Sequence, residues 1–309
     1  MRTALVLGAG GGIGGETARA LVARGWAVRG LTRRPREGEG IAWLTGDARD
    51  EAAVRAAAAG AGVIVHAVNP PGYRDWDRLV LPMLDNAIAA ALAEGARLVL
   101  PGTIYNYDPA ETPVARPDSP QRPRTRKGAI RRAMEERLRT TPGLRALVLR
   151  AGDFFGPRAG NNWLSQGMIR PGRPVRRVLD PGRRGAGHAW AYLPDVAEAL
   201  ARLLEREDRL PAFARHHVAG HWDPDGRGFA HAVLRAAGRP EGRVRSFPWW
   251  ALPAAGLFDV TLRELGEMRP FWTQGLRLDN ASLVAAIGAE PLTPLDEALR
   301  ETLAALGCL

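Results

Sequence analysis

The only lysine in this 309-residue chain, Lys127, lies in the stretch TRKGAIRRAMEE, four residues before Arg131. Residues four apart share one face of a helix, so this spacing brings two cations together. The pKa of an ammonium falls when it is desolvated or placed beside another cation, whereas a guanidinium stays charged in proteins. Lys127 is therefore a candidate proton donor or oxyanion stabiliser. The alternative is a basic surface loop. The neighbouring arginines are Arg122, Arg124, Arg126 and Arg132.

A glycine-rich stretch near the N-terminus, LVLGAGGGIGGETARAL, follows an apolar run and precedes a segment of helical period. Glycines at such a junction let the chain turn tightly, bring its backbone against a pyrophosphate and pack the helix on the strand. The helix N-terminus then offers unpaired N–H groups to the phosphates. Two spacings fit, G-x-G-x-x-G from Gly10 and G-x-x-G-x-x-G from Gly8. The pattern predicts a dinucleotide site. Its expected residues are Gly8, Gly11, Gly12, Ile13 and Gly14.

The second expected strand ends in LTRRP, which bears on the choice of cofactor. An NAD site usually places Asp or Glu here to bind the ribose hydroxyls, whereas an NADP site places Arg near the 2′-phosphate. A guanidinium fork matches a phosphate. Arg33 and Arg34 therefore predict NADP as the cofactor. NAD is the alternative, because Glu37 is close by and the chain is rich in arginine.

Three further groups of residues could take part in chemistry. Tyr105 and Tyr107 stand at an expected strand end, where they could donate a proton or pack at the sheet edge. Asp153, in RAGDFFG, follows another expected strand and is either an acid/base group or a turn residue. The histidines at 216, 217 and 221 occur in a short strand without clustered carboxylates, so no metal site is expected.

The elements that position these residues alternate between short apolar runs and longer segments of helical period over the first 150 residues. Such alternation indicates a parallel sheet covered by helices on both faces, the Rossmann-type doubly wound α/β fold. The expected strands are 3–7, 27–32, 41–44, 63–67, 97–100 and 145–149. The expected helices are 12–24, 50–59, 77–94 and 127–139.

After residue 156 the pattern becomes irregular, with Gly and Pro punctuating the chain to residue 187. A helix at 194–205 and a short strand at 216–219 follow, and the tail 247–309 is mostly helical and rich in large apolar residues. We therefore expect a smaller, mostly helical C-terminal cap that binds substrate. The expected NADP-binding Rossmann domain comprises 1–155, 186–206 and about 214–220, and the cap comprises 156–185 and 221–309.

The cap carries most of the nine tryptophans of the chain. An aromatic-lined pocket is the usual form of a small-molecule site, which favours a lipophilic or aromatic carbonyl substrate. Packing in the core is the alternative for these side chains, which include Trp163, Trp249, Trp250 and Trp272. Three arginines of the Gly/Pro-rich segment could instead hold an anionic group, such as the diphosphate of a nucleotide sugar, or be solvated. They are Arg173, Arg176 and Arg177.

Composition limits the remaining classes of function. The formal net charge is +10, yet arginine is scattered rather than gathered in runs with aromatics, so no nucleic-acid partner is expected. The single cysteine, Cys308, excludes an internal disulfide and a multi-cysteine metal site and indicates a reducing cytoplasm. No apolar stretch reaches the length of a membrane span, so no membrane partner is expected. The expected partner is a small-molecule substrate, and a homodimer is left open.

The ordered set of motifs resembles the short-chain dehydrogenase/reductase superfamily, in particular its extended and atypical branch, which includes the NAD-dependent epimerase/dehydratase family. The resemblance covers nearly the whole chain. Its motifs are the loop from Gly8 to Gly14, GDARD at 46–50, VIVHAVNPP at 63–71, RLVLPGTIYNYD at 97–108, LVLRAGDFFGP at 147–157 and HAWAYLPDVAEAL at 188–200.

The resemblance implies roles for five positions. Asp47 would contact the adenine amino group, with Ala48 beside it, although a loop carboxylate that caps the next helix is the plainer reading. Ala67 and Val68 would line the adenosine ribose. Thr103, in GTIYNYD, would stand at the hydroxyl position that orients the substrate oxygen.

The family's Tyr-x-x-x-Lys pair, which supplies the proton and binds the nicotinamide ribose, is missing from the next helix, because no tyrosine occurs between Tyr107 and Tyr192. Family members commonly carry a Glu four residues after the lysine. Glu135 then places Arg131 at the lysine position and Lys127 at the tyrosine position. The resemblance thus implies that both cations face the nicotinamide and that proton chemistry has moved off tyrosine.

The expected function is that of an NADP-dependent oxidoreductase of the extended or atypical short-chain type, transferring hydride to or from a carbonyl or alcohol carbon. Two alternatives stay open. One is nucleotide-sugar epimerisation or dehydration, which the missing tyrosine disfavours. The other is a non-catalytic NADP(H)-binding sensor similar to the NmrA-like regulators, which bind NADP on this fold without the Tyr-Lys pair.

Overall fold

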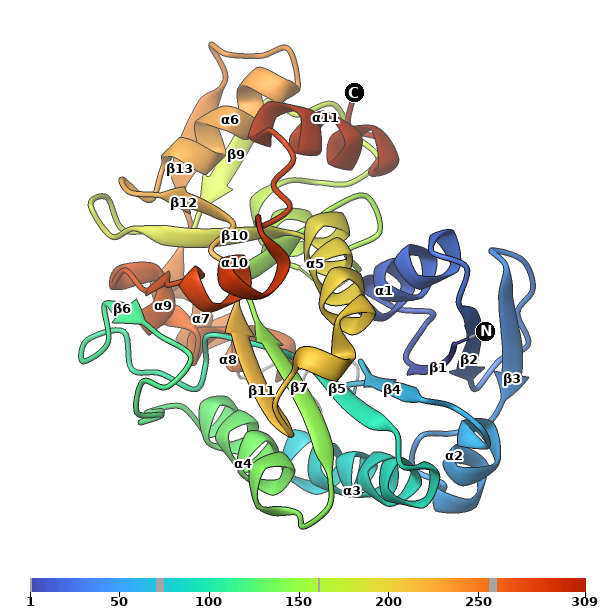
Figure 1. Cartoon of the computed structure of the whole chain (residues 1–309). Coiled ribbons are helices and arrows are strands. Elements are labelled where there is room, and N and C mark those ends of the chain that lie inside the picture. The colour runs from blue at the N-terminus through green and yellow to red at the C-terminus, as the bar shows by residue number, and fades with distance from the viewer. Residues whose placement is uncertain (1, 71–74, 161, 256–259) are drawn as a thin grey trace.

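The computed structural model of the chain describes residues 2–70, 75–160, 162–255 and 260–309 (Figure 1). Its centre is a seven-stranded parallel sheet with the strand order β11-β7-β5-β4-β1-β2-β3. The strands are β1 (Thr3–Leu7), β2 (Ala27–Thr32), β3 (Ile41–Thr45), β4 (Val63–His66), β5 (Arg97–Gly102), β7 (Arg145–Arg150) and β11 (Phe213–His217).

The first strand illustrates why the sheet is buried on both sides. Ala4 and Val6 pack into one hydrophobic cluster and Leu5 and Leu7 into a second, and all four are fully buried. Strands covered on both faces read as continuous apolar runs rather than as an alternation of apolar and polar residues. The six strands expected over the first 150 residues are confirmed, with boundaries that agree within two residues.

The seventh strand differs from its expected position. β11 begins at Phe213, three residues before the expected start at 216, and ends at His217. Its register against β7 pairs Phe213 with Ala146 and His217 with Arg150. The pairing partner therefore sets the limits of this edge strand, and its own sequence, FARHH, carries little apolar signal.

Helices cover both faces of the sheet, as the doubly wound fold requires (Figure 1). One face packs against α1 and α5, and the other packs against α2, α3 and α4. These helices are α1 (Gly12–Ala23), α2 (Glu51–Ala58), α3 (Trp76–Glu94), α4 (Arg126–Thr140) and α5 (Leu193–Glu205). All five expected helices are confirmed, with boundaries within one residue.

The start of α4 fixes the side chains that follow it. Thr125 is the N-cap, and its hydroxyl oxygen accepts the backbone N–H of Gly128 at 3.0 Å. A Cβ atom at Gly128 would lie 2.2 Å from the backbone oxygen of Tyr105, so only glycine allows this close approach. The first turn of α4, which contains Lys127, is therefore held against the segment that follows β5.

The remaining elements form small sheets and helices beyond the carboxyl ends of the central strands. Three strands assemble in the order β12-β10-β8, and the pairs β13-β9 and β14-β6 each join segments far apart in the sequence. The strands are β6 (Val114–Ala115), β8 (Asp153–Phe155), β9 (Arg177–Asp180), β10 (His188–Tyr192), β12 (His221–Asp223), β13 (Arg243–Ser246) and β14 (Arg277–Leu278). The helices are α6 (Gly228–Ala236), α7 (Leu252–Ala255), α8 (Val260–Gly266), α9 (Arg269–Thr273), α10 (Ala281–Ile287) and α11 (Leu295–Ala305).

This C-terminal part is mostly helical after residue 247, as expected, and it has its own aromatic core. Trp190 stacks on Phe229 with ring centroids 3.7 Å apart, and Trp163 meets Trp272 edge-on at 4.9 Å. Within the described residues, no helix has both the length and the apolar character needed to cross a bilayer.

Candidate active site

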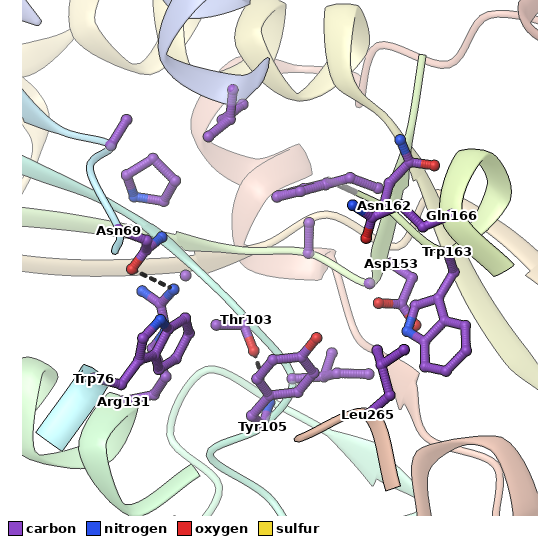
Figure 2. A pocket seen from close by; sticks show the side chains of 18 of the residues that line it. Asn69, Trp76, Thr103, Tyr105, Arg131, Asp153, Asn162, Trp163, Gln166 and Leu265 are labelled. Carbon is purple, nitrogen blue, oxygen red and sulfur yellow. Dashed lines mark hydrogen bonds between the residues drawn. The ribbon is translucent and has the colours of Figure 1, made fainter. Parts of the chain in front are cut away.

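A cavity of about 210 Å³ opens where β4, β5 and β7 end, which is the edge of a parallel sheet where ligands bind (Figure 2). Ile13, in the first turn of α1, lines one end of it, so the cavity adjoins the glycine loop. Figure 2 shows Thr103, Tyr105 and Arg131 on one side and Asp153 with Trp163 on the other. The cavity is therefore lined mainly by apolar and aromatic side chains with a few polar groups, which is usual for a small-molecule site.

The glycine loop has the geometry that a pyrophosphate requires. Gly8 has a φ of +90°, which favours glycine, and its carbonyl oxygen accepts the N–H of Gly11 at 2.9 Å. A Cβ atom at Gly14 would lie 2.3 Å from the carbonyl oxygen of Gly8, and one at Gly12 would lie 2.6 Å from that of Ala159. The backbone therefore approaches closely at three glycines, and α1 begins directly at this loop, so the residues present fit a dinucleotide phosphate.

Two arginines that favour NADP, Arg33 and Arg34, follow β2 and are exposed. A third arginine, which the sequence analysis did not single out, lies nearer to the glycine loop. A Cβ atom at Gly10 would lie 3.1 Å from Nη1 of Arg36, and this guanidinium packs over the ring of Trp43 at 5.4 Å. The Arg36 guanidinium thus lies beside the loop, and Arg33 and Arg34 precede it in the same segment after β2.

Beyond β3, Asp47 is held by Arg49. The Arg49 side chain donates to Oδ2 at 3.0 and 2.6 Å, and its backbone N–H donates to Oδ1 at 3.0 Å. These bonds from Arg49 hold the pKa of Asp47 below its usual value despite partial burial. The backbone oxygen of Ala48 accepts the amide of Asn86 on α3 at 3.0 Å. The pair Asp47–Ala48 is therefore a fixed loop with its carboxylate ionised.

The two small residues after β4 lie against the glycine loop. A Cβ atom at Gly8 would lie 2.6 Å from the carbonyl oxygen of Ala67 and 3.1 Å from a methyl group of Val68. Ala67 also lines the cavity. Both positions expected at the ribose thus adjoin the loop, and Ala67 also adjoins the cavity.

Thr103 and Tyr105 both line the cavity, and Tyr107 does not. The Thr103 hydroxyl oxygen accepts the backbone N–H of Tyr105 at 2.9 Å (Figure 2). The Tyr105 ring packs against that of Phe271, with ring centroids 5.4 Å apart. Tyr107 is fully buried, its hydroxyl accepts Nη1 of Arg150 at 2.6 Å, and burial raises its pKa to about 12. Of the two tyrosines considered from the sequence, Tyr105 is the one at the cavity.

Arg131 projects from α4 into the cavity wall. Its Nη2 donates to Oδ1 of Asn69 at 3.1 Å, and its guanidinium lies 5.0 Å from the ring centre of Trp76 (Figure 2). His66, at the end of β4, also lines the cavity and is buried, with 2% of its surface exposed. Burial and the nearby Arg131 charge lower the pKa of His66 to about 3, so its imidazole is neutral.

Lys127, one turn before Arg131, lies in a different environment. Its side chain is 1% exposed, and its ammonium contacts Oε2 of Glu264 at 2.5 Å and Oε2 of Glu267 at 2.6 Å. It also donates to the backbone oxygen of Glu264 at 3.1 Å. Lys127 is not among the residues that line the cavity, and Arg131 is, so the two cations that share a helix face meet different partners.

Among the described aromatic residues of the cap, Trp163 reaches the cavity. Trp163 lines it and packs against Trp249 and Trp272, whereas Trp250 is 86% exposed. Beside this wall lies a second, larger hollow of about 700 Å³, which shares Gln166 with the cavity. Its described lining contains no carboxylate. The arginines that line it are Arg170, Arg173, Arg176, Arg177, Arg243 and Arg245.

The three histidines considered for a metal face separate partners. Nδ1 of His216 contacts the Ser282 hydroxyl at 3.1 Å, and Nε2 of His217 contacts the Arg150 guanidinium at 2.8 Å. His221 stacks at a tilt with Phe155. Among the residues that the structure describes, no three His, Cys, Asp or Glu side chains are grouped to hold a metal ion.

Comparison with known proteins adds a family match and a fold match. The sequence matches the model of one family, the NAD dependent epimerase/dehydratase family, over residues 4–218. No curated protein matches the sequence.

Similar solved structures include the UDP-glucose 4-epimerase of Brucella ovis in complex with NAD, at 17% identity and a TM-score of 0.77, covering 99% of each chain. The UDP-glucose 4-epimerase of Bifidobacterium longum in complex with NAD⁺ and UDP has 15% identity and a TM-score of 0.73, covering 97% of each chain. The Bordetella bronchiseptica enzyme WbmH in complex with NAD⁺ has 20% identity and a TM-score of 0.71, covering 99% of this chain and 98% of that one. At these identities the likeness shows the Rossmann-type fold.

Proposed function

The chain belongs to the NAD dependent epimerase/dehydratase family, a family of enzymes, and on this premise we propose that it is an NADP-dependent oxidoreductase. It transfers hydride to or from a carbonyl or alcohol carbon of a small substrate. One observation carries the proposal: a small, largely apolar cavity adjoins the glycine loop at Ile13 and contains the Thr103 hydroxyl and the Arg131 guanidinium. A nicotinamide and a substrate carbon would meet there.

The cofactor supplies the hydride or accepts it, and the chain's residues bind it. Gly8, Gly11, Gly12 and Gly14 would hold the pyrophosphate, with Ile13 against the dinucleotide where α1 begins. The close backbone approaches at this loop support the assignment. The residues proposed at the adenosine end are Asp47, Ala48, Ala67 and Val68.

The preference for NADP rests on Arg33 and Arg34, and the position of Arg36 beside Gly10 adds support. Three guanidinium groups near the end of β2 provide charge and donors for a 2′-phosphate. NAD is the competing assignment, since the similar epimerases named above were solved with NAD. The two cofactors are distinguished by their dissociation constants.

The catalytic roles are proposed residue by residue. Thr103 orients the substrate oxygen, and Arg131 binds the nicotinamide ribose from α4. Tyr105 lines the cavity and can donate a hydrogen bond to the substrate oxygen. Lys127 is the second sequence candidate for proton transfer, and it can reach the cavity only if its contacts with Glu264 and Glu267 open.

A second function, nucleotide-sugar epimerisation or dehydration, is favoured by the arginine-lined hollow beside the cavity. Its arginines would bind a diphosphate while the sugar entered the smaller cavity, and Gln166 lines both. This arrangement also suits an oxidoreductase whose substrate carries an anionic group. Detection of an epimerised or dehydrated nucleotide sugar, rather than net oxidation of NADPH, would favour the second function.

The proposed organisation has 1–155, 186–206 and about 214–220 as the cofactor domain, and 156–185 with 221–309 as the cap. β11, at residues 213–217, supports the third segment because it pairs with β7 in the central sheet. A cytoplasmic location is proposed on the single cysteine of the sequence.

The test combines binding and turnover on the full chain. Calorimetry should give a lower dissociation constant for NADP(H) than for NAD(H), and the double variant Arg33→Ala/Arg34→Ala should lose this difference. Oxidation of NADPH is then followed with a panel of aldehydes and ketones. A wild type that binds NADP(H) and oxidises none of it with any substrate would support the sensor alternative.

The Lys127→Met variant tests the role of the lysine within the same assay. If Lys127 transfers a proton, kcat falls while the dissociation constant of NADPH stays within about threefold of wild type. Unchanged turnover would exclude that role. A matched control is Arg132→Met, on the same helix and exposed.

A further inference from the structure

Asp153 and His188 form a hydrogen-bonded pair, and Asp153 lines the cavity. We infer that this pair exchanges the proton that accompanies hydride transfer, an inference that rests on the proposed oxidoreductase function. Asp153 lines the cavity, and its side chain is 12% exposed, whereas the His188 side chain is 3% exposed. The Asp153 carboxyl group thus lies at the cavity wall (Figure 2), and the imidazole of His188, which does not line the cavity, is its buried partner.

Two neighbouring strands hold the pair in place. Asp153 is the first residue of β8, which follows directly after β7 at the carboxyl end of the central sheet. β8 runs parallel to β10, with Asp153 opposite Trp190, and His188 is the first residue of β10. The two side chains therefore come from paired strands, and backbone hydrogen bonds fix their separation.

The hydrogen-bond partners of His188 limit where protons can be. Nε2 of His188 lies 2.9 Å from Oδ2 of Asp153, and Nδ1 lies 3.3 Å from the backbone oxygen of Phe271. A backbone oxygen can only accept, and an ionised carboxylate can only accept. Two protonation states make both contacts hydrogen bonds. In the first, the ring is an imidazolium and both nitrogens donate. In the second, only Nδ1 has a proton, and a protonated Asp153 donates to Nε2.

These two states contain the same number of protons and differ only in the position of one. That proton lies either on Nε2 of His188 or on the Asp153 carboxyl group at the cavity. The pair can therefore present a proton to a substrate oxygen from a carboxyl group whose charge is balanced by the ring behind it. A side chain that is positioned to give a proton to the reacting oxygen is what general acid catalysis requires.

Two aromatic rings pack against the imidazole of His188. The ring stacks on Trp272 with centroids 3.8 Å apart and planes 8° from parallel, and Trp190 lies at 5.0 Å. An aromatic face attracts a cation. Two carboxylates besides Asp153 lie near His188. Asp223 on β12 is paired with His188 in the strand register, and Asp180 on β9 interacts with it electrostatically.

The proton balance of the step is simple. In the direction of reduction, hydride forms the new C–H bond, and the electron pair of the carbonyl π bond moves onto oxygen. The O–H bond of Asp153 breaks as the substrate O–H bond forms, and solvent water later returns one proton to the pair. In the direction of oxidation, the Asp153 carboxylate removes the hydroxyl proton and the same bonds reverse.

Other titratable side chains on the described cavity wall are less suited to this step. His66 is buried and has a pKa of about 3, so near neutral pH its imidazole is neutral and is not an acid that can donate a proton to the substrate. Arg131 keeps its charge and is held by Asn69. Tyr105, on the opposite side, can align the substrate oxygen together with Thr103 (Figure 2).

The test compares wild type with Asp153→Asn and His188→Gln in NADPH oxidation with the panel of aldehydes and ketones, across pH 5 to 9. Asp153→Asn should lower kcat by about 10² to 10⁴-fold, the range that a general acid contributes. The dissociation constant of NADPH should change less than about threefold, which a misfolded variant would not satisfy. His188→Gln should shift the pH dependence of kcat, because Asp153 loses the ring that shares its proton.

Asp180 needs its own control, because burial raises its pKa to about 6 and it faces the same ring. Asp180→Asn should keep the pH dependence that Asp153→Asn abolishes. If Asp153→Asn retained kcat within about threefold with an unchanged pH profile, the inference would be wrong while the proposed function stood.

A second measurement decides the protonation of the pair without turnover. Nitrogen chemical shifts of the six histidines, with His188→Gln for assignment, should show Nδ1 of His188 protonated at pH 7 in the full chain. A neutral His188 with the proton on Nε2 alone would overturn the inference. A wild type that binds NADPH and turns over nothing would refute the proposed function instead.

Discussion

Acid should destabilise this protein through His66, the buried histidine at the end of β4. Burial, with the nearby Arg131 charge, lowers its pKa from 6.5 to about 3. A group whose pKa is lower in the folded state contributes stability above its unfolded pKa and loses that contribution as the pH falls. The window for His66 therefore runs from about pH 6.5 down to about pH 3.

The size of the effect follows from linkage. Each pH unit within the window lowers the free energy of unfolding by about 1.4 kcal/mol for one proton bound only by the unfolded chain. At pH 5, which is about one and a half units into the window, the His66 contribution has fallen by about 2 kcal/mol. That is a large fraction of the stability of a typical domain.

Besides His216 and His221, whose pKa values are also lowered by burial, two groups titrate in the same range, and the effects of all four must cancel. His217 also has a pKa lowered to about 3, mainly by burial, and adds a loss of the same sign. The pKa of Asp180 is raised to about 6, so its contribution grows as the pH falls from 6 toward 3.8 and offsets part of the loss. All four groups are present in wild type and in His66→Gln, so the difference between the two proteins isolates His66.

The assay is urea unfolding followed by tryptophan fluorescence at pH 7, 6 and 5, without cofactor. The free energy of unfolding of wild type should fall by about 2 kcal/mol more than that of His66→Gln between pH 7 and pH 5. If the difference between the two proteins stayed constant with pH within about 0.5 kcal/mol, the neutral, buried state assigned to His66 would be refuted.

Two further predictions concern the glycine loop and the buried ion pair behind the site. Gly14→Ala places a Cβ atom 2.3 Å from the carbonyl oxygen of Gly8, so calorimetry should show at least about a tenfold loss of NADP(H) affinity. Gly62→Ala should bind as wild type, because its Cβ would meet only the backbone oxygen of Thr3, at a van der Waals distance of 3.9 Å. Arg150→Met removes the partner that donates to the buried Glu135 carboxylate at 2.8 and 2.5 Å, so the free energy of unfolding should drop by about 3–5 kcal/mol. A loss below about 1 kcal/mol in urea unfolding would contradict the second prediction.

The elements of the central sheet could be predicted because each carries its own pattern. The residues at 63–65, Val-Ile-Val, are buried and form a continuous apolar run before His66, and the helix at 193–205 has a clear apolar stripe. The short strands of the cap have no such signal. β9 pairs with β13, which lies more than sixty residues later in the chain, and β6 pairs with β14, more than one hundred and sixty residues later. These short strands are therefore defined only by their partners in the folded chain.

The candidate site was predictable where a residue type is tied to a motif. Thr103 and Tyr105 follow a strand and reach the cavity, and Arg131 was found from its spacing to Glu135. His188 was not considered, because its role depends on β8 and β10 lying side by side. The environment of Lys127 was the least predictable, because its carboxylate partners are Glu264 on α8 and Glu267 just after it, well over one hundred residues later in the sequence.

Chemical labelling of Lys127 can measure how often its ion pairs with Glu264 and Glu267 open. An amine-directed acylating reagent finds one side-chain target in the whole sequence, and in the folded protein that target is 1% exposed and bound by two carboxylates. Modification of Lys127 therefore measures how often α4 and α8 separate. Because α8 also supplies Leu265 to the cavity wall, the labelling rate read by mass spectrometry reports the opening of the substrate chamber, with no engineered probe.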